Sequence, residues 1–186
     1  MDAEGRAGTL HIPKQDVFFA KRLAHNEKQV RDKAMGMLQK WLGTKADFTE
    51  LEMFKICKGI FYCFWHSDKT TVQRQLAKDL SEMIHVFPEE SDMVGLYILC
   101  FLRTLNKEWY GIDRIRLDKY LMFLRIFLRN ILEYAARREW DETAAEVAAS
   151  WIRTGLLDPD EAVCAKGIVY HILDIYMEEL GLVAGG

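Results

Sequence analysis

Apolar residues recur at intervals of three and four along most of this chain, which is the spacing of amphipathic α-helices. Between residues 27 and 42, for example, Val30, Ala34, Leu38 and Trp41 fall on one side of a helix. No stretch alternates apolar and polar residues as a half-buried strand would. The pattern predicts helices over residues 17–25, 27–42, 50–65, 67–86, 91–109, 113–138, 141–155 and 159–180.

Several of these expected helices carry end signals in their sequence. Thr49 and Glu52 have the spacing of a capping box, in which the two side chains bond each other's backbone amides at the first turn. Pro159 stands at a first helical turn, where proline is well tolerated. The other predicted caps are Asn26, Ser91, Asp113 and Asp141, and the predicted stops are Gly43, Pro88 and Gly155.

The expected core is rich in aromatic side chains. Phe61, Phe64 and Trp65 share one helix face, which favours burial over a role in stacking nucleic-acid bases and leaves Tyr62 facing outward. Residues 93–102 are apolar on most sides, which predicts a central helix with neighbours on several faces. The expected core residues of the helix over 50–65 also include Leu51, Phe54, Ile56 and Ile60.

The helical pattern favours an all-α fold of antiparallel helical hairpins, arranged as an α-solenoid of the HEAT or armadillo kind. No clean internal repeat is visible, so a compact irregular helical bundle stays as the alternative. We expect a flexible tail over residues 1–13, one helical-repeat domain over 14–180, and a frayed C-terminus over 181–186.

The charge is spread unevenly along the chain. The net charge of −3 argues against a general polyanion binder. Basic residues nevertheless outnumber acidic ones by 9 to 4 over residues 101–138, and acidic residues prevail by 10 to 2 over 139–186. Such asymmetry concerns partners rather than fold, and the acidic end would suit a basic partner protein.

The four cysteines (Cys57, Cys63, Cys100 and Cys164) lie in apolar stretches without a Cys-x-x-Cys pair, so we expect reduced core residues. Residues 1–15 have no apolar segment typical of a secretory leader. The longest apolar run, residues 93–102, is too short to cross a bilayer, so no membrane partner is expected.

Motifs for catalysis or metal binding are weak. Glu82 and His85 have the Glu-x-x-His spacing of a di-iron helix, but such a site needs a second copy and two further carboxylates. Lys58-Gly59 lacks the further glycines of a phosphate-binding loop. The sequence predicts no enzyme, cofactor, metal or small-molecule substrate, with a metal-dependent helical-bundle enzyme as the alternative to be tested by metal analysis.

Two basic clusters are the candidate RNA-binding sites. The first, the N-terminal cluster, contains Lys21, Arg22, Lys28, Arg31 and Lys33, and the second, the junction cluster, contains Arg114, Arg116 and Lys119. Either could neutralise phosphates. The alternative is a solvated face on which neighbouring carboxylates balance the charges.

The junction cluster sits in residues 109–120, between the two most apolar segments. Arg116 and Lys119 are three apart and share one helix face, while Arg114 and Asp118 are four apart and could pair on another. The segment is therefore either a structural clasp between the two most buried helices or a contact surface, and we expect it to be a weaker RNA site than the N-terminal cluster.

Three segments of the chain have a distinctive sequence. They are Phe-Ala-Lys-Arg-Leu-Ala at residues 19–24 with its continuation over 26–34, residues 58–69 around Phe-Tyr-Cys-Phe-Trp, and residues 106–120 around Trp-Tyr-Gly-Ile-Asp. All three resemble segments of the ribosomal RNA-processing protein 1 family of eukaryotic nucleolar proteins. The last segment is the most specific of the three. Together they cover roughly residues 17–130 in the right order.

The resemblance implies a non-catalytic assembly factor in the nucleolus, needed for pre-ribosomal RNA processing in the large-subunit precursor. It also implies other large-subunit assembly factors as partners, pre-ribosomal RNA as a candidate ligand, and a helical-repeat scaffold. The alternative is a generic α-solenoid adaptor for proteins, without RNA contact.

Overall fold

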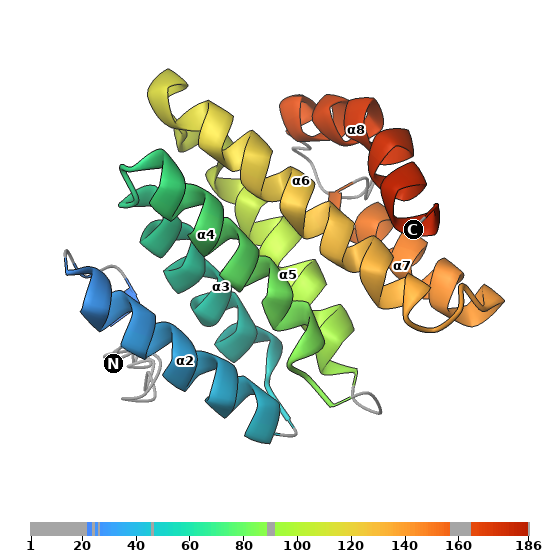
Figure 1. The fold of residues 1–186 in the computed structure, drawn as a ribbon, viewed down its shortest axis with the longest axis horizontal. Helices are drawn as coiled ribbons and strands as arrows, with labels where there is room; N and C mark the ends of the chain where they lie inside the picture. The colour runs from blue at the N-terminus through green and yellow to red at the C-terminus, as the bar shows by residue number, and fades with distance from the viewer. Residues whose placement is uncertain are drawn as a thin grey trace, which may run out of the picture.

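The computed structural model describes residues 22–23, 25, 27–45, 47–88, 92–156 and 165–185. Within these ranges the chain is helical and contains no strand, which confirms the all-α prediction (Figure 1). Its α-helices are α2 (Lys28–Thr44), α3 (Glu50–Trp65), α4 (Thr70–Ser81), α5 (Met93–Glu108), α6 (Arg114–Ala136), α7 (Glu142–Leu156) and α8 (Lys166–Ala184), and two 3₁₀ turns are η1 (Glu82–His85) and η2 (Trp109–Gly111).

From α3 onward the helices pack in two rows, because the most extensive contacts join a helix to the second one along the chain. One row is α3, α5 and α7, and the other is α4, α6 and α8. Figure 1 shows the elements progressing from α2 at one end of the molecule to α7 and α8 at the other. Stacked helical hairpins need this kind of packing. The HEAT- or armadillo-like superhelix itself stays a prediction, with the compact bundle as its alternative.

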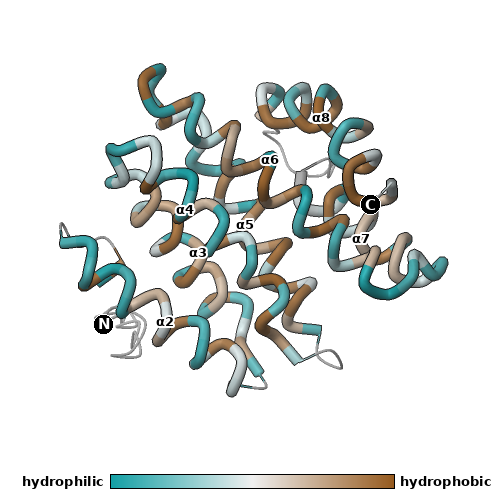
Figure 2. The backbone as a smooth tube through the Cα atoms, in the orientation of Figure 1, coloured by the Kyte–Doolittle hydropathy of each residue, from teal (hydrophilic) through white to brown (hydrophobic). Residues whose placement is uncertain are grey.

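An aromatic core joins α3, α5 and α6. The rings of Phe64 and Phe123 are 4.6 Å apart, and those of Phe101 and Phe127 are 4.3 Å apart. Phe61 and Phe64 are buried and Trp65 is half-buried, whereas Tyr62 is exposed, as predicted for this run. Helix α5 is buried along most of its length, and in Figure 2 it is more hydrophobic than α2 and α4. The aromatic run therefore serves packing.

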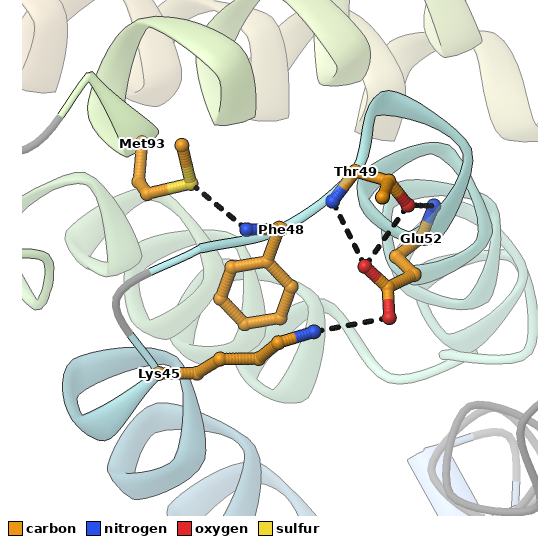
Figure 3. Close-up of polar contacts among 5 residues, drawn as sticks. All are labelled: Lys45, Phe48, Thr49, Glu52 and Met93. Carbon is orange, nitrogen blue, oxygen red and sulfur yellow. Dashed lines mark hydrogen bonds and ion pairs between the residues drawn. The ribbon is translucent and has the colours of Figure 1, made fainter.

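The predicted capping box begins α3 and is confirmed (Figure 3). Thr49 Oγ1 accepts from the Glu52 amide at 3.3 Å, and Glu52 Oε2 accepts from the Thr49 amide at 2.8 Å. Lys45 Nζ adds a bond of 3.0 Å to Glu52 Oε1 and so ties the end of α2 to the start of α3. The predicted caps at Asp113 and Asp141 are also confirmed, since each carboxylate accepts an amide three residues ahead.

The two glycines predicted as helix stops lie inside helices. Gly43 is within α2, and a Cβ there would come 3.2 Å from the Val86 carbonyl oxygen. Gly155 is within α7, and a Cβ there would come 3.0 Å from the Leu102 side chain. Among the described residues no glycine has a positive φ. Both glycines therefore permit close packing of a neighbour and do not terminate their helices.

Other predicted ends and burials shift as well. Helix α4 begins at Thr70 rather than at 67–68, because Ser67 completes the end of α3 with a bond from its Oγ to the Phe64 carbonyl at 2.6 Å. Helix α8 continues to Ala184 rather than ending at 180, because Leu180 and Val183 pack on the core. Leu51 was a predicted core residue, but it lies beside the buried stripe of α3 and is exposed.

Several sequence predictions fall outside the described residues. They are the tail over 1–13, most of the helix over 17–25, the caps Asn26 and Ser91, the Asp158-Pro159 helix start, and Cys164. The other three cysteines, Cys57, Cys63 and Cys100, are free and buried, as expected. No helix within the described ranges combines the length and apolarity that a membrane crossing requires.

Candidate nucleic-acid interface

The N-terminal cluster lies on and before α2. Lys21 is outside the described residues; Arg22, Lys28 and Lys33 are exposed, and Arg31 is half-buried. Lys28 forms an ion pair with Asp32 one turn further on, and Arg31 Nη1 donates to the His25 carbonyl at 2.7 Å. The structure thus keeps these cations near the surface but already gives two of them protein partners.

A groove of about 450 Å³ runs beside this cluster, between α2 and α4. Lys28 and Arg31 line it, but so do the carboxylates of Asp32, Asp79 and Glu82. Phosphate binding needs a groove with an excess of positive charge. The groove lacks that excess, so RNA contact by the N-terminal cluster would have to occur on its solvent side.

Lys119, a predicted RNA contact, is only 7% exposed. Its ammonium donates to the carbonyl oxygens of Phe64 at 2.9 Å, Trp65 at 2.7 Å and Ser67 at 2.8 Å. Burial, together with the positive charge of Arg116, lowers the pKa of Lys119 to about 8, so the group still carries three protons at neutral pH. All three protons are used inside the protein, and Lys119 therefore leaves the set of RNA candidates.

These carbonyls stand where α3 ends, and the last carbonyls of a helix have no partner within it. A cation is also favoured there by the helix dipole. Two residues of α6 strengthen the same contact: Tyr120 donates its hydroxyl to the Phe61 carbonyl at 2.9 Å, and the Arg116 guanidinium lies 4.6 Å from the Trp65 ring. We call Arg116, Lys119 and Tyr120 with the end of α3 the α3–α6 clasp.

The predicted clasp was therefore right in kind and wrong in its partners. It joins α6 to the end of α3, whereas the sequence analysis placed it between the helices now seen as α5 and α6. Arg116 also pairs with Asp113, the N-cap of its own helix. The expected Arg114–Asp118 pair does not form within the described part of the chain, and Arg114 is exposed. Arg114 remains an RNA candidate from this cluster.

A second groove, of about 760 Å³, lies between α4 and α6 and was not predicted. Arg74, Lys78 and Arg129 contribute three cations to its lining, against the two carboxylates of Glu82 and Glu133. In the sequence, Arg125 and Arg129 are four residues apart and form a polar stripe on the otherwise apolar α6, but the α4 cations are some fifty positions away. Lys78 pairs with Glu82 and Arg129 pairs with Glu179 of α8, so the exposed Arg74 is the cation that makes this α4–α6 groove a candidate RNA surface.

The Glu82–His85 spacing does not lead to a metal site among the residues described, where no three His, Cys, Asp or Glu side chains gather. The ring of His85 instead contacts Asn130 Oδ1 at 3.2 Å. Burial lowers the pKa of His85, so it is mostly neutral at pH 7. Both observations give His85 a packing role between η1 and α6.

A buried carboxylate anchors α8 to α6. Glu179 is fully buried, and its oxygens receive bonds from Arg125 Nη1 at 3.1 Å and from Arg129 Nε at 2.6 Å. Glu178, which is exposed, adds a second contact to Arg125 at 2.9 Å. The polar stripe of α6 that the sequence revealed is therefore largely a binding surface for α8.

Comparison with known proteins addresses the family directly. Residues 14–185 match the family described as nucleolar protein, Nop52. The chain belongs to this family. It is 39% identical to ribosomal RNA processing protein 1 homolog B of Mus musculus over 181 residues, which are 95% of this chain and 25% of that protein. The match confirms the resemblance found in the sequence, since the family is described as nucleolar and these relatives are named as ribosomal RNA processing proteins.

Two further relatives extend the comparison. Ribosomal RNA processing protein 1 homolog B of Homo sapiens is 37% identical over 91% of this chain and 23% of its own length. The homolog of Drosophila melanogaster is 31% identical over 97% of this chain and 26% of its own length. The chain thus spans about a quarter of the length of these curated relatives.

Proposed function

We propose that this chain is a non-catalytic helical scaffold in the maturation of the large ribosomal subunit precursor, needed for pre-ribosomal RNA processing. In this role it contacts other assembly factors and a segment of pre-ribosomal RNA. Its membership of the Nop52 family over residues 14–185 carries this proposal, together with the relatives' names as ribosomal RNA processing proteins.

The described surface fits such a scaffold in its general character. Its hollows include grooves between helices that are lined by mixed charges. The known kinds of catalytic centre need clustered titratable groups or a metal in a cleft. The candidate RNA contacts that remain are Arg22, Lys28, Arg31, Lys33 and Arg114, with Lys21 still a prediction outside the described residues and Arg74 of the α4–α6 groove as a further candidate.

A charge-reversal experiment tests the RNA contact. The triple variant Lys28→Glu/Lys33→Glu/Arg114→Glu changes three exposed cations of the two clusters. The matched control, Lys40→Glu/Lys69→Glu/Arg153→Glu, changes three exposed cations elsewhere by the same total charge. We expect ultraviolet crosslinking of the tagged chain to precursor RNA to fall about tenfold in the first variant and little in the control, because each phosphate contact adds to affinity.

Three results would contradict parts of this function. Equal crosslinking of both variants would remove the assigned RNA contact. If the wild type also showed no crosslink but still sedimented with large-subunit precursors, the chain would be a protein adaptor, an alternative that the internal use of Lys119 and Lys28 favours. Absence of the tagged chain from precursor particles would overturn the scaffold role itself.

A further inference from the structure

Helix α8 is apolar on two opposite sides. One side buries Ile168, Ile172 and Ile175. On the other side Tyr170, Leu173 and Met177 are 62%, 65% and 72% exposed. Their spacing of three and four residues places them in one line along the helix. We call Tyr170, Leu173 and Met177 the α8 stripe.

The α8 stripe differs from the other apolar residues at the surface. Among the described residues, the remaining large apolar side chains with high exposure outside α8 are scattered over α2, α3, η2 and α6. Single exposed apolar residues are normal, whereas a contiguous group marks a surface that binds another molecule.

The position of α8 in the fold explains why this side is open. Helix α8 makes its main contact with α6, and α6 in turn contacts α4. Figure 1 shows α8 at the edge of the molecule, with α6 between it and α4. The α8 stripe therefore faces the place where a further helix of the same row would pack, and a helix is the shape that fits it.

The charge beside the stripe indicates the chemistry of that helix. Asp174 is exposed, follows Leu173 directly, and has no ion pair within the described ranges. Glu178, also exposed, lies one turn further along the same edge. Glu178 already pairs with Arg125, and the exposed Lys166 lies one turn before Tyr170 on the same side of α8, so Asp174 is the carboxylate beside the middle of the stripe that has no ion pair among the described residues. Lysine or arginine on the occupant would complement this edge.

The same charge argues against a second copy of this chain as the occupant. A two-fold dimer of antiparallel α8 helices would place residues near the middle of Lys166–Ala184 opposite themselves. Asp174 is next to that midpoint, so the two Asp174 carboxylates would face each other across an apolar contact. Like charges in such a position oppose association.

We propose that the α8 stripe is a docking surface for an amphipathic helix of a partner protein, whose apolar side covers Tyr170, Leu173 and Met177 and whose flank carries basic residues that face Asp174. This surface rests on the scaffold function proposed above, because it supplies one of the partner contacts that such a scaffold needs. Residues at i, i+3 and i+7 form a ridge along one side of a helix, and such ridges are what two packed helices interlock.

A pair of synthetic peptides tests the docking surface on the purified chain. Both are helical and share one leucine face, but one has lysines along its flank and the other has glutamates at the same positions. We expect the lysine peptide to bind in a fluorescence-anisotropy titration at least tenfold more tightly than the glutamate peptide. We also expect Asp174→Lys to reduce that preference several-fold.

Substitutions on the chain locate the binding. Leu173→Ser/Met177→Ser should weaken lysine-peptide binding at least tenfold, while the control Met37→Ser/Leu51→Ser, at exposed apolar positions on α2 and α3, should leave it unchanged. Thermal melts by circular dichroism verify that each variant is folded. Equal binding to the stripe variant and the control, or no preference for lysine, would overturn the docking surface.

Light scattering tests the remaining possibility, that a second copy of this chain covers the stripe. A dimer of the wild type that Leu173→Ser/Met177→Ser dissociates would show a second copy on the stripe and would also overturn the proposed partner helix. The peptide titration does not depend on ribosomal particles. Failure of the chain to sediment with precursors would therefore count against the scaffold function alone, and failure of the peptide would count against the α8 surface alone.

Discussion

The cations of the N-terminal cluster and those of the junction cluster look alike in sequence, since both are short basic runs mixed with aspartates at the start of a helix. Their positions in the fold differ. On α2, Lys28 and Lys33 are exposed and Lys28 pairs with Asp32 on its own helix. On α6, Lys119 is buried against three carbonyls of another part of the chain. The comparison shows that similar basic runs can differ in exposure. The run on α2 stays at the surface, whereas Lys119 of the run on α6 turns inward because the carbonyls at the end of α3 accept its protons.

Replacing Lys119 is the strongest way to test this contrast. Lys119→Met keeps the length of the side chain but leaves the carbonyls of Phe64, Trp65 and Ser67 without their shared donor. The Phe64 carbonyl keeps the Ser67 hydroxyl and the Ser67 carbonyl keeps the Gln73 side-chain amide, so the loss falls mainly on the Trp65 carbonyl. We expect the free energy of unfolding in urea to fall by about 2 kcal/mol, because a buried carbonyl left without a donor is costly. The control Lys33→Met, on exposed α2, should change it by less than about 0.5 kcal/mol. A loss below about 1 kcal/mol for Lys119→Met would mean that Lys119 contributes as little to stability as the exposed cations of α2.

Glu52, in the first turn of α3, is intermediate between the exposed α2 cations and the buried Lys119. Its side chain is partly buried against Lys45, the residue that follows α2. The Thr49 amide and Lys45 lower the pKa of Glu52 from 4.5 to about 2. The folded chain therefore keeps the carboxylate while the unfolded chain takes up a proton as pH falls through 4.5, so this stabilisation is complete at neutral pH and declines toward pH 2.

Glu52→Gln should lower the free energy of unfolding by about 1 kcal/mol at pH 7, the usual scale of a helix cap. The gap between variant and wild type should narrow in urea titrations at pH 3. Glu146→Gln, at an exposed position of α7, serves as the control and should show little change at either pH. A gap that stays constant with pH would mean that the charge of Glu52 does not matter.

The smallest effect is expected for the Lys28–Asp32 pair. Both side chains are more than half exposed, so solvent and salt screen their attraction. A double-mutant cycle with Lys28→Ala and Asp32→Ala should give a coupling energy below about 0.5 kcal/mol. A coupling above about 1 kcal/mol would make the α2 cations structural, like those of the α3–α6 clasp.

Local interactions were the part of the fold that could be read from the sequence. The capping box of Thr49 and Glu52 and the cap at Asp113 involve residues three apart, and helical spacing alone placed Phe61 and Phe64 in the core. Gly43 was misread because its role depends on Val86, which lies far along the chain. A glycine that ends a helix and one that admits a neighbour are identical in a local pattern.

The candidate site was harder to predict from the sequence, because it too depends on contacts between distant parts of the chain. Lys119 donates to carbonyls at the end of α3 because of how α6 packs against a helix that lies more than fifty residues earlier in the chain. The α4–α6 groove likewise combines Arg74 and Lys78 with Arg129, which no single stretch of sequence brings together. Charge runs could therefore be located from the sequence, but the cations left available for a ligand could not.

The buried Glu179 also bears on which way α8 is turned. Because α8 is apolar on both sides, hydrophobic contact alone would let it roll about its axis and bury Tyr170, Leu173 and Met177 instead of its isoleucines. Glu179 meets both Arg125 and Arg129 in only one of these orientations, and in the other it would leave two guanidinium groups without their carboxylate. Buried ionic groups are known to select one register among packings of similar energy. Glu179 thus favours the rotation of α8 that buries the isoleucines and leaves Tyr170, Leu173 and Met177 exposed.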